Sequence, residues 1–134
     1  MFIAWEDSYK LGIPNIDSDH HLLVDLLNRF FERAEAGEET RQLGQILAEL
    51  IETTRAHFAR EELMLDRNDY PGLATHAAEH RRLLQQMQHF QGPFAEGWAS
   101  RALTIEHAEF LRHWLLDHIE REDRPYKPYV MKLS

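Results

Sequence analysis

Residues 40–67 read TRQLGQILAELIETTRAHFAREELMLDR, and the periodicity of this stretch decides the fold. Residues that favour helices dominate it, and no proline interrupts it. Seven side chains recur at alternating steps of four and three, which is the period of the inner face of a helix in a bundle. They are Leu43, Leu47, Leu50, Thr54, His57, Glu61 and Met64. The stretch therefore predicts one long helix whose buried face changes from apolar to ionisable along its length.

Three further segments repeat this period, so the chain is expected to be all-α, an up-down antiparallel four-helix bundle. The expected helices are residues 18–36, 40–67, 73–91 and 98–122. Residues 1–16 are expected to form an N-terminal arm that packs along the bundle, and residues 124–134 a short C-terminal tail. The short connections between long helices predict that neighbouring helices run in opposite directions.

Capping and helix-breaking residues predict where the helices begin and end. Asp17 or Ser18 can cap the first helix, and Thr40 is a suitable start for the second. Gly92 and Pro93 are expected to end the third helix, because proline lacks the N–H group that continues a helix.

The composition narrows the class of protein. A chain of 134 residues fits a single domain, residues 1–134, and its net charge of −8 provides no basic stripe for a nucleic-acid partner. No apolar run is long enough to span a membrane, and residues 1–7 lack the basic start of a signal peptide. We therefore expect a cytoplasmic protein without a membrane partner. The absence of cysteine excludes thiolate chemistry. The chain contains nine histidines, a high number that needs an explanation.

The predicted inner faces of all four helices carry ionisable residues. A buried carboxylate without a partner is costly, and no lysine or arginine lies on these faces, so we expect a metal ion to supply positive charge. The candidate ligands are His20, His57, Glu61, His76, His80 and His118. Six nitrogen and oxygen ligands exceed the set of one tetrahedral zinc ion, which indicates two metal ions, with iron favoured over manganese.

A seventh ligand can be supplied by either of two neighbouring acidic residues. Glu122 follows His118 by four residues and shares its helix face, whereas Asp123 follows by five and is rotated by about 140° on an ideal helix. Spacing alone favours Glu122. The helix must end near Pro125, however, and a distorted last turn could direct Asp123 inward.

These motifs resemble those of the hemerythrins, in particular the bacterial single-domain branch, the bacteriohemerythrins. The resemblance covers essentially the whole chain, including a leading arm with Trp5 and Tyr9. The matching segments are residues 16–20 (IDSDH), residues 57–62 (HFAREE), Tyr70-Pro71 followed by His76 and His80, and residues 114–119 (WLLDHI) followed by Asp123 and Tyr126.

The resemblance implies a non-haem diiron centre with an oxo or hydroxo bridge, at which dioxygen binds reversibly. It implies that His76, His80 and His118 hold one iron, that His20 and His57 hold the other, and that Glu61 and Asp123 bridge both. It thus prefers Asp123 to Glu122. Five neutral imidazoles against two carboxylates favour reversible binding over the oxygenation performed by carboxylate-rich diiron enzymes. Storage, delivery or sensing of dioxygen is expected, and not an enzyme.

Apolar neighbours of these ligands are candidates for a dry oxygen pocket. Leu23, Leu115 and Ile119 are proposed to line it, and simple core packing is the equal alternative. Tyr126 is expected to support Asp123 or the chain end by a hydrogen bond, or else only to pack.

The other four histidines are not expected to bind iron. Three of them, His21, His89 and His113, are expected to lie away from the centre, and His107 to be a hydrogen-bonded core residue. Alternative functions are a diiron peroxidase, a nitric-oxide-consuming enzyme, and an iron storage or detoxification protein. A downstream oxygen-using protein is a possible partner, and the oligomeric state stays open.

Overall fold

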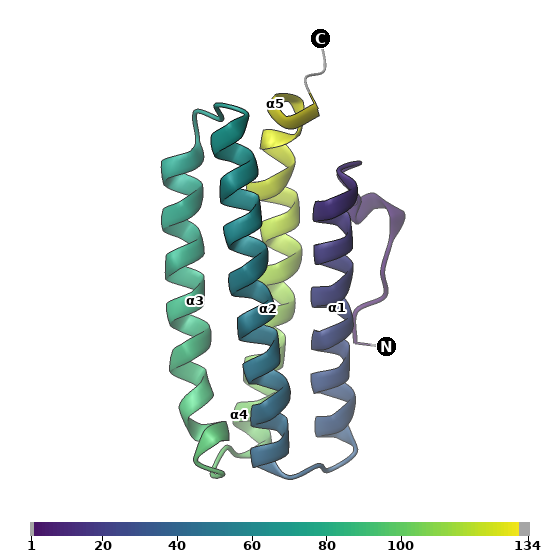
Figure 1. The fold of residues 1–134 in the computed structure, drawn as a ribbon. Helices are drawn as coiled ribbons and strands as arrows, with labels where there is room; N and C mark the ends of the chain where they lie inside the picture. Colours follow the sequence, from purple (N-terminus) through teal and green to yellow (C-terminus); the bar gives the residue numbers. More distant parts are fainter. Residues whose placement is uncertain (1, 132–134) are drawn as a thin grey trace.

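Four long helices form the body of the protein in a computed structural model that describes residues 2–131, apart from the side chains of Glu122 and Met131. The elements are η1 (Asp7–Tyr9), α1 (Pro14–Glu35), α2 (Thr40–Arg67), α3 (Leu73–Ala95), α4 (Arg101–Asp117), η2 (His118–Asp123), η3 (Arg124–Tyr126) and α5 (Lys127–Met131). The long helices run alternately up and down (Figure 1), so the expected all-α antiparallel four-helix bundle is confirmed. The expected tail, in its described part, forms η3 and α5.

The inner faces of the helices follow the predicted period almost throughout. Leu47 and Leu50 of α2 are buried with Leu27 of α1 and Leu111 of α4 in one hydrophobic core. At the end of the α2 stripe the pattern differs, because Leu65 is fully buried there while the preceding Met64 is half-buried. An α-helix has 3.6 residues per turn, so a strict seven-residue repeat drifts around the helix and the inward position shifts by one residue.

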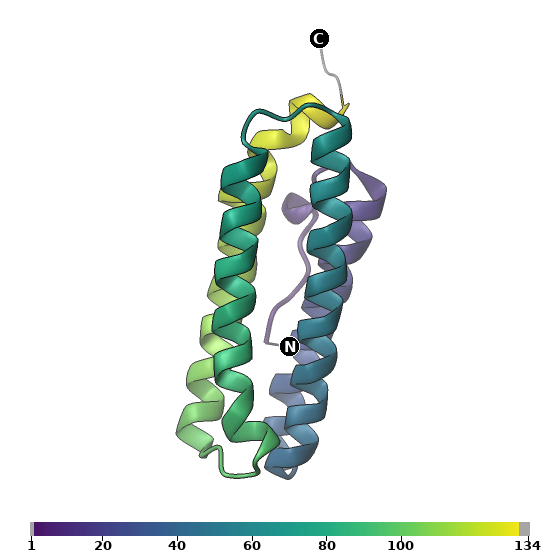
Figure 2. The same ribbon diagram turned by 60° about the vertical axis from the view of Figure 1, so that its left-hand side comes forward.

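The N-terminal arm packs along the bundle, as expected, and runs beside α1 (Figure 2). The backbone of Ile3 exchanges two hydrogen bonds with the buried side chain of Asn28, both at 2.7 Å. The ring of Phe2 stacks on Phe31 of α1 at 4.1 Å, and the guanidinium of Arg112 from α4 covers it. The arm therefore contacts both α1 and α4.

The first helix begins earlier than the sequence predicts. Pro14 occupies its first turn after Ile13, and neither Asp17 nor Ser18 is the N-cap. Proline suits this position because its missing N–H would be unpaired in the first turn in any case. Asp17 instead accepts hydrogen bonds from the backbone N–H groups of Leu11 and Gly12, at 2.7 and 3.0 Å. Its carboxylate thus fixes the arm to the helix.

The third helix continues past its predicted end and includes Pro93 in its last turn. Gly92 has no Cβ to clash with the proline ring, so the pair can stay helical, and the helix ends at Ala95. The second helix starts at Thr40, as expected. The fourth starts at Arg101, three residues later than predicted, where the hydroxyl of Ser100 accepts a hydrogen bond from the N–H of Leu103.

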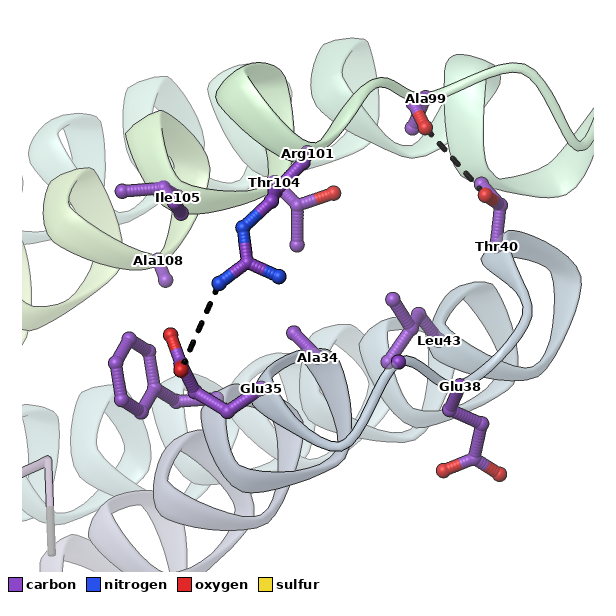
Figure 3. A pocket seen from close by; sticks show the side chains of 12 residues that line it. Ala34, Glu35, Glu38, Thr40, Leu43, Ala99, Arg101, Thr104, Ile105 and Ala108 are labelled. Atoms are coloured by element: carbon purple, nitrogen blue, oxygen red, sulfur yellow. Dashed lines mark hydrogen bonds and ion pairs between the residues drawn. The ribbon is translucent and has the colours of Figure 1, made fainter.

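A cavity of about 210 Å³ lies at the end of the bundle where the α1–α2 and α3–α4 connections meet. Beside it Arg101 pairs with Glu35 at 3.7 Å, and the hydroxyl of Thr40 donates to the carbonyl oxygen of Ala99 (Figure 3). Among the described residues that line it, none is a candidate ligand, so it is separate from the site below. Within residues 2–131, no helix combines the length and the apolar character that a membrane crossing needs.

Candidate metal centre

Seven buried side chains converge at the opposite end of the bundle, and they come from α1, α2, α3 and η2. They form two overlapping groups, in each of which one ligand atom of every residue lies within 4.8 Å of the others. The first group is Glu61, His76, His80, His118 and Asp123, and the second is His20, His57, Glu61 and Asp123. The structure thus brings together all seven residues that the sequence singled out. One group contains three of the histidines and the other contains two, and both groups share the same two carboxylates.

The carboxylate of Glu61 spans the two groups. Its Oε1 lies 2.5 Å from Nε2 of His76 and 3.1 Å from Nε2 of His80. Its Oε2 lies 3.1 Å from Nε2 of His57, one helical turn away on α2. One oxygen therefore faces the three-histidine group and the other faces the two-histidine group.

Asp123 is arranged in the same way. Its Oδ1 lies 3.0 Å from Nε2 of His118 and 3.2 Å from Nε2 of His76, while its Oδ2 lies 2.8 Å from Nε2 of His20. All five histidines thus present Nε2 to the carboxylates. This geometry suits two cations that share two bridging carboxylates.

A π-helical turn explains how Asp123 reaches the site. Residues His118–Asp123 form η2, a π-helix, in which each backbone hydrogen bond spans five residues instead of four. The wider turn reduces the rotation between His118 and Asp123, so both side chains are buried at the centre. Ideal helix geometry had favoured Glu122, whose side chain lies outside the described residues.

Several buried polar atoms at the centre lack a hydrogen bond within the part of the chain that the structure describes. They include Nε2 of His20, His57, His80 and His118 and both carboxylate oxygens of Asp123. These atoms lie close to one another but do not form hydrogen bonds with one another. Ligand atoms that surround a cation are arranged in this way. Imidazole nitrogen and carboxylate oxygen are ligands that suit iron, so the residues present fit an iron site.

Without a cation the cluster holds its charge as protons. Burial opposes protonation of the histidines, yet the carboxylates of Asp19 and Glu61 raise the pKa of His57 to about 9. Burial likewise opposes protonation of His118, but Asp123 and Glu61 raise its pKa to about 10. Burial acts to raise the pKa of Glu61, but the surrounding histidines keep it well below its usual range. Metal binding would displace these protons.

Two acidic residues outside the cluster orient ligand candidates. Nδ1 of His57 donates to Oδ2 of Asp19 at 2.9 Å, and Arg60 also holds that carboxylate, at 2.7 and 3.1 Å. Nδ1 of His80 donates to Glu62 at 3.0 Å. Such partners fix the ring so that Nε2 faces the metal. Sequence reasoning gave these residues no role, although their positions directly beside His20 and Glu61 were a usable signal.

Aromatic side chains complete the walls of the cluster. The ring of Phe58 stacks on His80 with centroids 3.7 Å apart. The hydroxyl of Tyr126 donates to Oε2 of Glu61 at 3.2 Å. The expected partner, Asp123 or the chain end, is therefore wrong. Tyr126 lies in η3, directly after the π-helical turn, and its side chain is fully buried.

The three candidate pocket residues lie inside the hydrophobic core. Leu23 and Leu115 are each 1% exposed, and Ile119 is fully buried beside His118. Leu23 lies one helical turn from His20 and Leu115 one turn from His118, and a role in admitting dioxygen stays a prediction.

The remaining histidines lie outside both groups, and His21, His89 and His113 are exposed. His107 is fully buried, but the expected hydrogen bond is wrong, because neither ring nitrogen has a partner among the described residues. Its neighbours are the rings of Phe30, Phe90, Phe94 and Phe110. This apolar burial lowers the pKa of His107 to about 4 and keeps the ring neutral.

Together, fold and site define a cation-binding four-helix bundle. Residues 11–130 match the family described as the hemerythrin HHE cation binding domain. The chain belongs to the hemerythrin family.

Individual relatives agree with this assignment. Bacteriohemerythrin of Stenotrophomonas maltophilia is 27% identical over 128 residues, 96% of this chain and 81% of the relative. Myohemerythrin of Riftia pachyptila is 28% identical over 125 residues, 92% of this chain and 90% of the relative. A crystal structure of wild-type hemerythrin has a TM-score of 0.85 at 27% identity and covers 97% of this chain and 98% of that chain.

Proposed function

We propose that the chain binds dioxygen reversibly at two iron ions held between its four helices. The observation that carries the proposal is the sharing of Glu61 and Asp123 between the two groups of histidines. Dioxygen binding is the function of the hemerythrin family, and the relatives carry hemerythrin names and not the names of enzymes. The proposed ligands are His76, His80 and His118 on one iron and His20 and His57 on the other, with both carboxylates bridging.

The two-histidine side is the proposed place of oxygen binding. It offers four ligating residues, whereas the three-histidine side offers five, so one more position is left for an external molecule. When bound, the iron pair would supply the two electrons that dioxygen withdraws reversibly. The hydrogen bond from His57 to Asp19 holds the imidazole in place on this side.

The protein matrix favours reversibility. Leu23, Leu115 and Ile119 are buried, each within three residues of a ligand candidate in the sequence, and would exclude water from the cluster. A dry apolar shell limits the supply of protons, which slows irreversible oxidation of the metal. We assign these three residues to the oxygen pocket on this ground.

Metal analysis combined with visible spectroscopy tests the proposal. Anaerobically reduced protein is expected to contain two irons per chain and to develop an absorption band on exposure to oxygen that disappears under vacuum. Zinc in place of iron, or fewer than two metals, contradicts the two-iron site. Rapid conversion to a ferric form without the reversible band supports an enzyme or an iron store instead.

The physiological use we propose is storage or delivery of dioxygen in the cytoplasm, with an oxygen-using protein as recipient. Cell fractionation tests the compartment, and transfer of oxygen from the loaded protein to a candidate oxidase tests delivery.

A further inference from the structure

Tyr126 links the metal cluster to residues outside it. The side chain is fully buried, and its hydroxyl donates to Glu61 at 3.2 Å. Its ring also lies 5.6 Å from the ring of His76, at an angle of 61°. The phenol of Tyr126 therefore lies beside two ligand candidates, close to where a metal ion would be held.

From Tyr126 a chain of rings continues to the surface. Tyr70, in the turn between α2 and α3, lies 6.1 Å from Tyr126 in an edge-to-face arrangement, and Tyr129 of α5 lies 5.1 Å from Tyr70. These spacings correspond to rings in contact. Tyr129 is 45% exposed, so the chain of rings ends in solvent. Both ribbon views place α5 beside the α2–α3 turn (Figures 1 and 2).

The α2–α3 turn makes room for the middle ring. A Cβ on Gly72 would lie 2.8 to 3.0 Å from Cε2, Cζ and the hydroxyl oxygen of Tyr70, so a larger residue there would force this ring to shift. Three of the four tyrosines of the chain thus form one series from the cluster to the surface. The fourth, Tyr9, packs on Trp5 in the arm.

We propose that Tyr126, Tyr70 and Tyr129 form a relay that carries one oxidising equivalent from the metal centre to the surface when hydrogen peroxide oxidises the protein. This proposal rests on the iron centre of the proposed function. Tyrosine is among the most easily oxidised side chains, and electrons pass most rapidly between rings in contact. The relay would protect the ligand histidines by moving the oxidising equivalent away from them.

The reaction involves the reduction of hydrogen peroxide to two water molecules, which breaks the O–O bond and consumes two electrons and two protons. A half-oxidised iron pair held by the cluster would supply one of these electrons, by oxidation of its ferrous ion to the ferric state, and Tyr126 would give the other. Tyr70 then reduces Tyr126, and Tyr129 reduces Tyr70. In sum Tyr129 loses one electron and its phenolic proton, and this proton passes to solvent. Solvent also supplies the two protons that the reduction of hydrogen peroxide consumes. Tyr129 remains as a neutral phenoxyl radical.

The alternative is that the three rings only pack against one another, and phenylalanine distinguishes the two. Tyr70→Phe keeps the ring and its packing but removes the oxidisable phenol. Tyr129→Phe removes the terminal radical site, and Tyr9→Phe is the matched control because Tyr9 lies outside the series.

The experiment adds one equivalent of hydrogen peroxide to half-oxidised, iron-loaded protein. Electron paramagnetic resonance of frozen samples detects tyrosyl radical, and mass spectrometry locates dityrosine between two copies of the chain. The wild type and Tyr9→Phe are expected to form dityrosine at Tyr129. In Tyr70→Phe and Tyr129→Phe its yield is expected to fall at least tenfold.

Iron content and the oxygen-dependent band are measured on the same samples, which separates the relay from the proposed function. If Tyr70→Phe, with both irons and the band intact, forms as much dityrosine at Tyr129 as the wild type, the relay is wrong. Wild-type protein with both irons and the band but without tyrosyl radical also overturns it.

Discussion

Glu61 and Asp123 divide their oxygens in the same way between two groups of histidines. Oε1 of Glu61 and Oδ1 of Asp123 both lie near Nε2 of His76, at 2.5 and 3.2 Å. Their other oxygens lie near Nε2 of His57 and His20, at 3.1 and 2.8 Å. Both carboxylates are fully buried, so the two groups share one pair of negative charges. The proposed two-iron site depends on this shared pair.

Asp123→Asn tests the shared carboxylate most simply. The amide keeps the size of the side chain but removes the charge that two cations would share, so at least one of the two irons is expected to be lost. Glu122→Gln is the control, because it changes the neighbouring acidic residue that spacing alone had favoured. Iron per chain is the measurement, and loss of iron in the control but not in Asp123→Asn would contradict the assignment.

Asp19→Asn tests the orientation of His57. Because Asp19 holds Nδ1 of this ring, we expect iron affinity to fall about 10- to 100-fold. Competition with a chelator measures the change. Asp25→Asn is the control, since Asp25 is exposed and pairs with the exposed His21. Equal iron affinity of the two variants would show that the hydrogen bond to His57 has no such role.

The sequence was sufficient to predict the bundle and the inward position of six histidine and carboxylate side chains. Residues such as His57 and Glu61 lie on a regular helix, where the period alone determines which face is buried. Asp123 could not be placed in this way, because its orientation depends on the π-helical turn in which it lies. The resemblance to hemerythrins identified it where ideal helix geometry did not.

Other features depend on contacts between distant segments, which a helical period does not contain. The backbone of Ile3, in the arm, is held by the side chain of Asn28, 25 positions further along the chain. The hydrogen bond from Tyr126 to Glu61 joins residues 65 positions apart. His107 was expected to have a hydrogen-bond partner, but the sequence did not show that aromatic rings surround it.

Leu115→Ala tests the proposed oxygen pocket. Removing this buried side chain opens space beside the cluster for water, so autoxidation of the oxygen-loaded protein is expected to accelerate severalfold. Leu47→Ala is the control, because Leu47 is equally buried but lies ten residues before His57 on α2. Each truncation is expected to cost about 2–5 kcal/mol of stability. Unchanged autoxidation in Leu115→Ala would leave core packing as the only role of this leucine.

His107→Leu is expected to change how stability depends on pH. The pKa of His107 is lowered to about 4 in the folded chain, whereas an unfolded histidine has a pKa of about 6.5. Its neutral form therefore contributes stability above pH 6.5, and that contribution is lost as the pH falls toward 4. Between pH 7.5 and pH 5 the wild type should lose about 2 kcal/mol more than His107→Leu.

Urea titrations at the two pH values measure this difference. His89→Leu is the control, because His89 is exposed and its substitution should leave the pH dependence as in the wild type. If the free energy of unfolding of His107→Leu falls as much between pH 7.5 and pH 5 as that of the wild type, His107 is not held neutral in the folded chain.

An oxygen titration of the anaerobically reduced, iron-loaded protein tests the central claim most directly. The ratio of bound dioxygen to iron should be one dioxygen for every two irons. All of the bound dioxygen should be recovered when the oxygen pressure is lowered, and repeated cycles should give the same result. Consumption of oxygen without recovery, or one dioxygen for each iron, would contradict reversible binding at a shared pair.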